Sequence, residues 1–163
     1  MAVTTVDMIT QRIRDIYDVI PDLKVFQFVP RGVTSTSLPC VIVWPGGMTP
    51  SNPRTGASDV SQVQTWTAIV LLENARLGTA GQAEEEAQTF DIFGKVATQF
   101  FGRRRLQLSA DGLDQGIVEN ALISHGDLIL RPYPFNSENL YLGVDFTHTV
   151  NFVGYYPALF TSS

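Results

Sequence analysis

The sequence predicts an α+β fold, with a mostly antiparallel twisted sheet and two helices packed on one face of it. Two segments show helical periodicity, and the segments that follow each of them show the alternation or the short apolar runs of strands. This order of helix, strands, helix, strands differs from the alternating pattern of a parallel sheet. The 163 residues, of which 44% are hydrophobic, fit a single domain that spans residues 1–163.

Both predicted helices are amphipathic. The first spans residues 4–20, can be capped by Thr4 or Thr5, and is stopped by Pro21. Its apolar residues recur at helical spacing and are Val6, Ile9, Ile13, Ile16, Tyr17 and Ile20. The second helix spans residues 82–101, and its apolar stripe is expected to lie close on the sheet. That stripe consists of Ala83, Ala87, Phe90, Gly94, Ala97 and Phe101, thickened by Phe93, Val96 and Phe100.

Alternation identifies the two longest strands, at residues 60–72 and 141–152. In the first, one face carries Val63, Thr65, Thr67, Ile69 and Leu71, and the other carries Gln64, Trp66, Ala68, Val70 and Leu72. In the second, Leu142, Val144, Phe146, His148 and Val150 alternate with Gly143, Asp145, Thr147 and Thr149. Shorter strands are predicted at residues 106–108, 117–123 and 128–131.

Residues 23–29 and 40–44 are predicted to form an antiparallel hairpin with a polar loop. Residues 45–59 then change character, because they are rich in Gly, Pro, Ser and Asn, and they predict a long loop with several turns. The wider segment at about 45–62 is expected to be either a flexible loop or an extended hairpin. We expect the segment at 45–59 to be mobile in the free protein and to become ordered on a partner. Its candidate interface residues are Thr49, Asn52 and Arg54.

Composition disfavours partnership with nucleic acid or membrane. The net charge of −5 gives no global electrostatic footprint for nucleic acid. Lys24 and Lys95 are the only lysines, which disfavours a polybasic membrane patch. The longest aliphatic run, residues 68–72, is too short to span a bilayer, and the first residues lack the features of a secretory signal. We therefore expect no membrane partner and a protein that is made and used in the cytoplasm.

The histidines, the cysteine and the glycine-rich segments of the sequence do not form a recognisable catalytic or metal-binding pattern. His125 and His148 have no second histidine or cysteine at ligand spacing, which disfavours a metal site. Cys40 begins an apolar strand, where burial raises the pKa of a thiol and hides it. The sequence contains no Gly-x-Ser-x-Gly elbow, and residues 78–81 lack the Lys-Ser/Thr tail of a phosphate loop. We predict that the chain is not an enzyme and has no catalytic residue, metal or cofactor.

Two charge runs mark the ends of the second predicted helix. The acidic run is Glu84, Glu85 and Glu86, and the arginine run is Arg103, Arg104 and Arg105. The main interpretation is that both runs stabilise the helix dipole, because negative charge is favoured at the start of a helix and positive charge at its end. Two alternatives remain. In the first, the acidic run of one subunit pairs with the arginine run of its neighbour in a head-to-tail ring. All six residues are then candidate interface residues. The arginines can also form a phosphate-binding patch, which the net acidity disfavours.

Five segments carry a resemblance that covers nearly the whole chain. They are residues 6–13 (VDMITQRI), 38–43 (LPCVIV), 66–72 (WTAIVLL), the alanine-rich helix at 82–101, and 141–147 (YLGVDFT). In organisation and texture, rather than in an exact motif, they are similar to the tail-terminator, or tail-completion, proteins of long-tailed bacteriophages. That family offers no catalytic residues to transfer to this chain.

The resemblance implies a structural protein of the virion. A homohexameric ring would cap the head-proximal end of the tail tube, stop its polymerisation, and join the tail to the head. The implied partners are further copies of the chain, the tail-tube protein and the head-connector or head-closure protein, with DNA passing through the ring without specific binding. The nearest alternative is another phage joint, a head-closure or tail-tube subunit. Other classes are a small enzyme or ligand-binding domain, and a nucleic-acid-binding module.

Overall fold

The computed structural model describes residues 4–33, 35–53, 59–74, 82–108, 116–126, 129–133 and 136–155. In chain order the elements are α1 (Val6–Asp18), β1 (Lys24–Val25), the short 3-10 helix η1 (Ser35–Ser37), β2 (Cys40–Pro53), β3 (Asp59–Asn74), α2 (Gln82–Phe101), β4 (Asn120–His125), β5 (Ile129–Tyr133) and β6 (Asn136–Tyr155). Both predicted helices are present, and α2 has the bounds that its periodicity predicted.

The described strands form one sheet of six, in the order β1-β2-β3-β6-β4, with β5 also paired to β6. Every pairing is antiparallel except that of β1 with β2. β3 and β6 form the centre and pair from Asp59 opposite Tyr155 to Asn74 opposite Tyr141, with one register shift between Leu71 and Glu73. The predicted α+β class, with a mostly antiparallel sheet, is confirmed.

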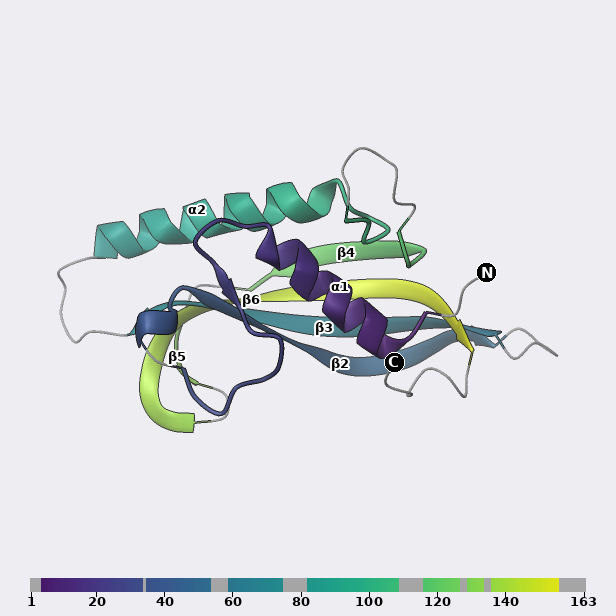
Figure 1. Cartoon of the computed structure of the whole chain (residues 1–163), viewed down its shortest axis with the longest axis horizontal. Coiled ribbons are helices and arrows are strands. Elements are labelled where there is room, and N and C mark those ends of the chain that lie inside the picture. The colour runs from purple at the N-terminus through teal and green to yellow at the C-terminus, as the bar shows by residue number, and fades with distance from the viewer. Residues whose placement is uncertain are drawn as a thin grey trace.

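Both helices pack on the same face of this sheet (Figure 1). Side chains of α1 and α2 join those of β2, β3 and β6 in one buried cluster, whose largest fully buried members are Trp66, Tyr17 and Phe152. The alternation predicted for β3 and β6 is confirmed, because Trp66 and Val150 face the helices. Ile69 lies on the opposite face, in a smaller cluster that also contains Cys40. The sheet therefore has two covered faces near its centre.

Polar contacts fix α1 on the sheet. Thr5 caps the helix by accepting a hydrogen bond from the backbone N–H of Met8 at 3.2 Å. The hydroxyl of Thr10 accepts a bond from the indole Nε1 of Trp66 at 2.8 Å, and itself donates to the carbonyl of Val6 at 2.8 Å. The buried indole N–H thus finds the partner that a buried tryptophan needs.

The prediction of a loop at 45–59 was wrong for residues 45–53. These residues belong to β2 and pair with β3 as far as Pro53 opposite Val60. Their prolines are tolerated because β2 lies near the sheet edge, where β1 pairs only with Cys40 and Val41, and because the strand is bulged in this region. The segment takes the form of an extended hairpin up to Pro53. Its tip, residues 54–58, lies outside the described residues.

The predicted hairpin of residues 23–29 and 40–44 was also wrong. β1 contains only two residues, and it runs parallel to β2, with Lys24 opposite Cys40. After β1, Phe26 and Leu38 pack against the smaller core cluster, on the sheet face opposite the helices. The chain leaves the sheet edge here, and these side chains remove part of that apolar face from water.

The strand predicted at 106–108 is absent: the structure describes a turn at residues 104 and 105, followed by irregular backbone. Leu106 is fully buried with a φ of 54°, and its carbonyl accepts a hydrogen bond from Arg12 at 2.8 Å. Next to it, the carbonyl of Arg104 accepts a bond from the N–H of Ala121 at 2.6 Å. The first bond ties this segment to α1, and the second ties it to the start of β4.

Gly116 allows the chain to return across this turn, and replacing it is expected to be costly. It has a φ of 79°, and a Cβ at this position would overlap the carbonyl oxygen of Arg105. Gly116→Ala is therefore expected to lower the free energy of unfolding by about 2 kcal/mol or more. Urea denaturation measures the change. Gly102→Ala is the matched control because a Cβ there has open space; an equal effect of both variants would contradict the prediction.

Candidate subunit interface

The structure places the two charge runs at opposite ends of α2. The acidic run lies in the first turns of the helix, and the arginine run begins just after its last residue, Phe101. A helix of 20 residues is about 30 Å long, so the two runs are far apart within one subunit. They do not meet inside the chain. The structure does not describe the side chains of the acidic run.

The three arginines have different surroundings. Nη1 of Arg103 donates to the carbonyl oxygen of Gln99 at 2.7 Å and to the side-chain oxygen of Gln99 at 2.9 Å, so Arg103 caps the end of α2. Nε of Arg105 donates to the carbonyl of Val118 at 3.3 Å and fastens the following turn. The side chain of Arg104 is exposed. Capping therefore accounts for Arg103, whereas Arg104 is directed to the surface.

The remaining candidates belong to the β2–β3 hairpin. Thr49 lies opposite Val63 and Asn52 lies opposite Ser61, in the distal half of β2. Their side chains, and all of Arg54, lie outside the described part of the chain. Through β3 and β6, Thr49 shares a row with Asn120 of β4. Because Ala121 bonds to Arg104, the arginine run and Thr49 lie at the same end of the sheet but on opposite edges.

The apolar stripe predicted to pack on the sheet is instead partly exposed. The buried face of α2 is formed by Ile92, Val96 and Phe100, which follow one another at four-residue spacing. Phe90 is 64% exposed and Phe101 is 71% exposed. Helix α2 has two apolar faces, and the face that contains Ile92 and Val96 packs on the sheet. Their helical spacing had predicted a single stripe.

Gly94 lies between the two exposed phenylalanines on α2. Apart from its chain neighbours and the backbone of its own helix, no atom of the described structure lies within 4 Å of where its Cβ would be. A glycine in the interior of a helix is less favourable than alanine by about 1 kcal/mol. Packing within the subunit therefore gives no reason for a glycine at this position, whereas close approach by another backbone would.

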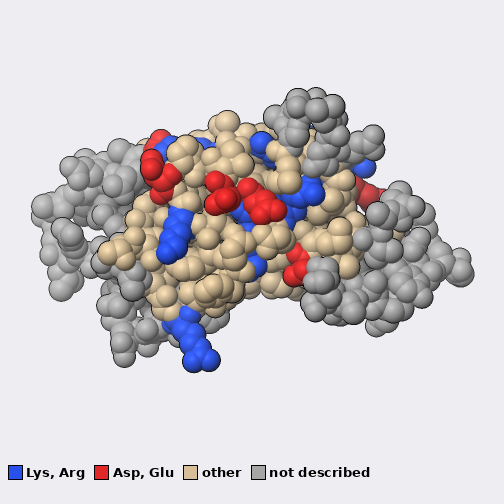
Figure 2. Space-filling model, viewed as in Figure 1, with Lys and Arg blue, Asp and Glu red and all other residues tan. Residues whose placement is uncertain are grey.

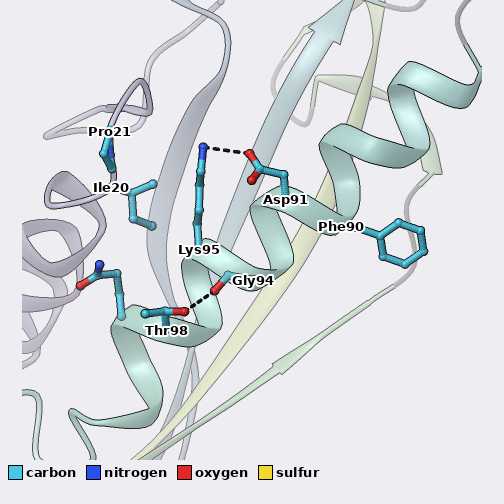
Figure 3. A pocket seen from close by; sticks show the side chains of 8 residues that line it. Ile20, Pro21, Phe90, Asp91, Gly94, Lys95 and Thr98 are labelled. Atoms are coloured by element: carbon cyan, nitrogen blue, oxygen red, sulfur yellow. Dashed lines mark hydrogen bonds and ion pairs between the residues drawn. The ribbon is translucent and has the colours of Figure 1, made fainter.

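A shallow groove runs beside Gly94, between α2 and the turn that follows α1 (Figure 3). Its volume is about 350 Å³, and Ile20 and Pro21 form its far wall. Asp91 and Lys95 line it and are bound to each other at 2.8 Å. A second hollow of about 230 Å³ shares Pro21, Asp91 and Lys95 with it. The side chain of Phe90 points away from the Ile20–Pro21 wall in Figure 3.

The residues considered for catalysis lie apart from this surface. Cys40 is fully buried, and burial raises the pKa of its thiol to about 12. His148 is buried with its Nε2 atom 2.7 Å from the hydroxyl of Tyr17, and burial lowers its pKa to about 3. His125 is exposed and stacks on Phe93 with 4.3 Å between ring centroids. Within the described ranges, no three His, Cys, Asp or Glu side chains gather to hold a metal ion.

Acidic and basic side chains are interspersed on the described part of the face shown in Figure 2. No family model matches the sequence, and no curated protein matches it. Among the helices that the structure describes, none is long and apolar enough to cross a membrane.

Proposed function

We propose that this chain is a structural, ring-forming subunit of a phage tail, and not an enzyme. In this proposal it caps the head-proximal end of the tail tube, stops tube polymerisation, and offers a docking surface to the head connector or head-closure protein. DNA passes through the ring without specific binding. The proposal rests on the resemblance of the order of elements to tail-terminator proteins, together with the shape of the sheet.

The length of the β2–β3 hairpin is the structural observation that supports an assembly role best. β3 contains 16 residues and is therefore about 50 Å long, whereas α1 with 13 residues is about 20 Å long. The distal ends of β2 and β3 lie beyond both helices in Figure 1. A strand pair of this length can contact a neighbouring subunit, and a repeated contact of this kind closes into a ring when its rotation permits.

The purified protein is expected to form rings with a central hole, visible by negative-stain electron microscopy, with six-fold symmetry in class averages. Adding the protein to polymerising tail-tube subunits should shorten the tubes and leave it at one end. Polymerisation of the chain alone into long tubes would favour the tail-tube alternative. A monomer at every concentration, with no effect on tube length, would overturn the proposal.

A further inference from the structure

The exposed face of α2 carries two of the large apolar side chains that the described part of the chain leaves in water. Phe90 and Phe101 each expose well over half of their surface, although both lie on a helix whose opposite face is buried in the core. Gly94 lies between them, and Ala97 is only half-buried. The face has large side chains near its ends and a glycine near its middle. This arrangement permits close contact between helices.

The charges at the two ends of α2 indicate which partner fits this face. The acidic run precedes Gly94 by about as many residues as the arginine run follows it. A second α2 helix that runs antiparallel across Gly94 would therefore place its arginine run beside the acidic run, and the reverse at the other end. A parallel arrangement would instead bring like charges together. The helix is thus complementary in charge to an antiparallel copy of itself.

Side-chain sizes match in the same register. With Gly94 of both copies on the two-fold axis, Phe101 of one copy comes opposite Ala87 of the other, so that a large residue meets a small one. Phe90 of one copy comes opposite Thr98 of the other, which is exposed.

We propose that α2 packs antiparallel against α2 of a second copy of this chain, about a two-fold axis at Gly94. The contact would bury Phe90 and Phe101, give the helix glycine a packing role, and pair the acidic run of each copy with the arginine run of the other. It does not depend on the ring, because a ring closes through a head-to-tail contact, whereas this contact pairs two subunits or joins two rings face to face.

Disulfide trapping tests the two-fold axis directly. In a Gly94→Cys variant the two introduced cysteines face each other, and mild oxidation is expected to yield a covalent dimer on non-reducing gels. Thr98→Cys is the matched control because it is also exposed, yet its two copies would be about 12 Å apart along the helices, beyond disulfide reach. Cys40 is buried and does not interfere. Equal crosslinking of the two variants, or none in either, would overturn the proposal.

A charge swap tests the pairing of the two runs. Arg104 is the suitable arginine because its side chain is exposed, whereas Arg103 and Arg105 bond to backbone carbonyls of their own subunit. Arg104→Glu is expected to weaken the pairing of subunits at least about tenfold in sedimentation equilibrium, and adding Glu84→Arg is expected to restore most of it. Thermal melts confirm that each variant is folded. If Arg104→Glu leaves the association unchanged, or if the double variant is weaker still, the antiparallel pairing is wrong.

Discussion

Lowering the pH from 7 to 4.5 is expected to reduce the free energy of unfolding by roughly 3 kcal/mol through His148 alone. Burial lowers the pKa of His148 to about 3, from an ordinary value of 6.5. The side chain is fully enclosed between Tyr17 and Phe100, with ring centroids 5.5 and 4.5 Å away. Below pH 6.5 the unfolded chain therefore binds a proton that the folded chain does not. The stabilisation is complete above pH 6.5 and is lost progressively as the pH falls toward 3.

Urea denaturation at several pH values measures this dependence. His148→Gln should lower stability at pH 7 and should lose roughly 3 kcal/mol less than the wild type between pH 7 and pH 4.5. His125→Gln is the matched control, because His125 is the only other histidine and it is exposed. A His148→Gln variant that keeps the wild-type pH dependence would show that carboxylates, and not this imidazole, govern the acid limb.

Trp66→Ala is expected to lower the free energy of unfolding by roughly 3–5 kcal/mol. Trp66 is fully buried in the larger core cluster, where its ring lies 6.2 Å from that of Phe152. The substitution leaves a cavity between the sheet and α1, and it removes the hydrogen bond that links the indole to Thr10. Thermal and urea denaturation, followed by circular dichroism, measure the loss.

Trp44→Ala provides the comparison for Trp66, because the chain contains two tryptophans and Trp44 is only half-buried. Its side chain packs at the margin of the smaller cluster, so its removal should cost clearly less than that of Trp66. Trp66→Phe should fall between the two, because it keeps most of the apolar volume but not the indole N–H. If Trp44→Ala were the more costly variant, the smaller cluster would be the principal core.

Short-range patterns were sufficient for the helices and the two central strands. The spacing of Ile9, Ile13 and Ile16 predicted α1, and the alternation around Trp66 and Val150 assigned both strand faces correctly. These patterns report the periodicity of burial, which each segment carries in its own residues. The positions of the acidic and arginine runs at the ends of α2 followed in the same way, because helix ends have local signals.

Only the tertiary structure decided how these segments use their surfaces. Residues 45–53 have a composition that favours turns, but they pair with β3. The long neighbouring strand offers backbone hydrogen bonds that the local preference of these residues does not predict. Helix α2 has two apolar stripes, and only the stripe that contains Val96 is buried on the sheet, whereas Phe90 stays exposed. The bond between Tyr17 and His148 joins residues 131 positions apart. The sequence by itself determined the periodicity of each element, whereas partner, direction and exposed face depend on contacts between distant segments, which no local pattern records.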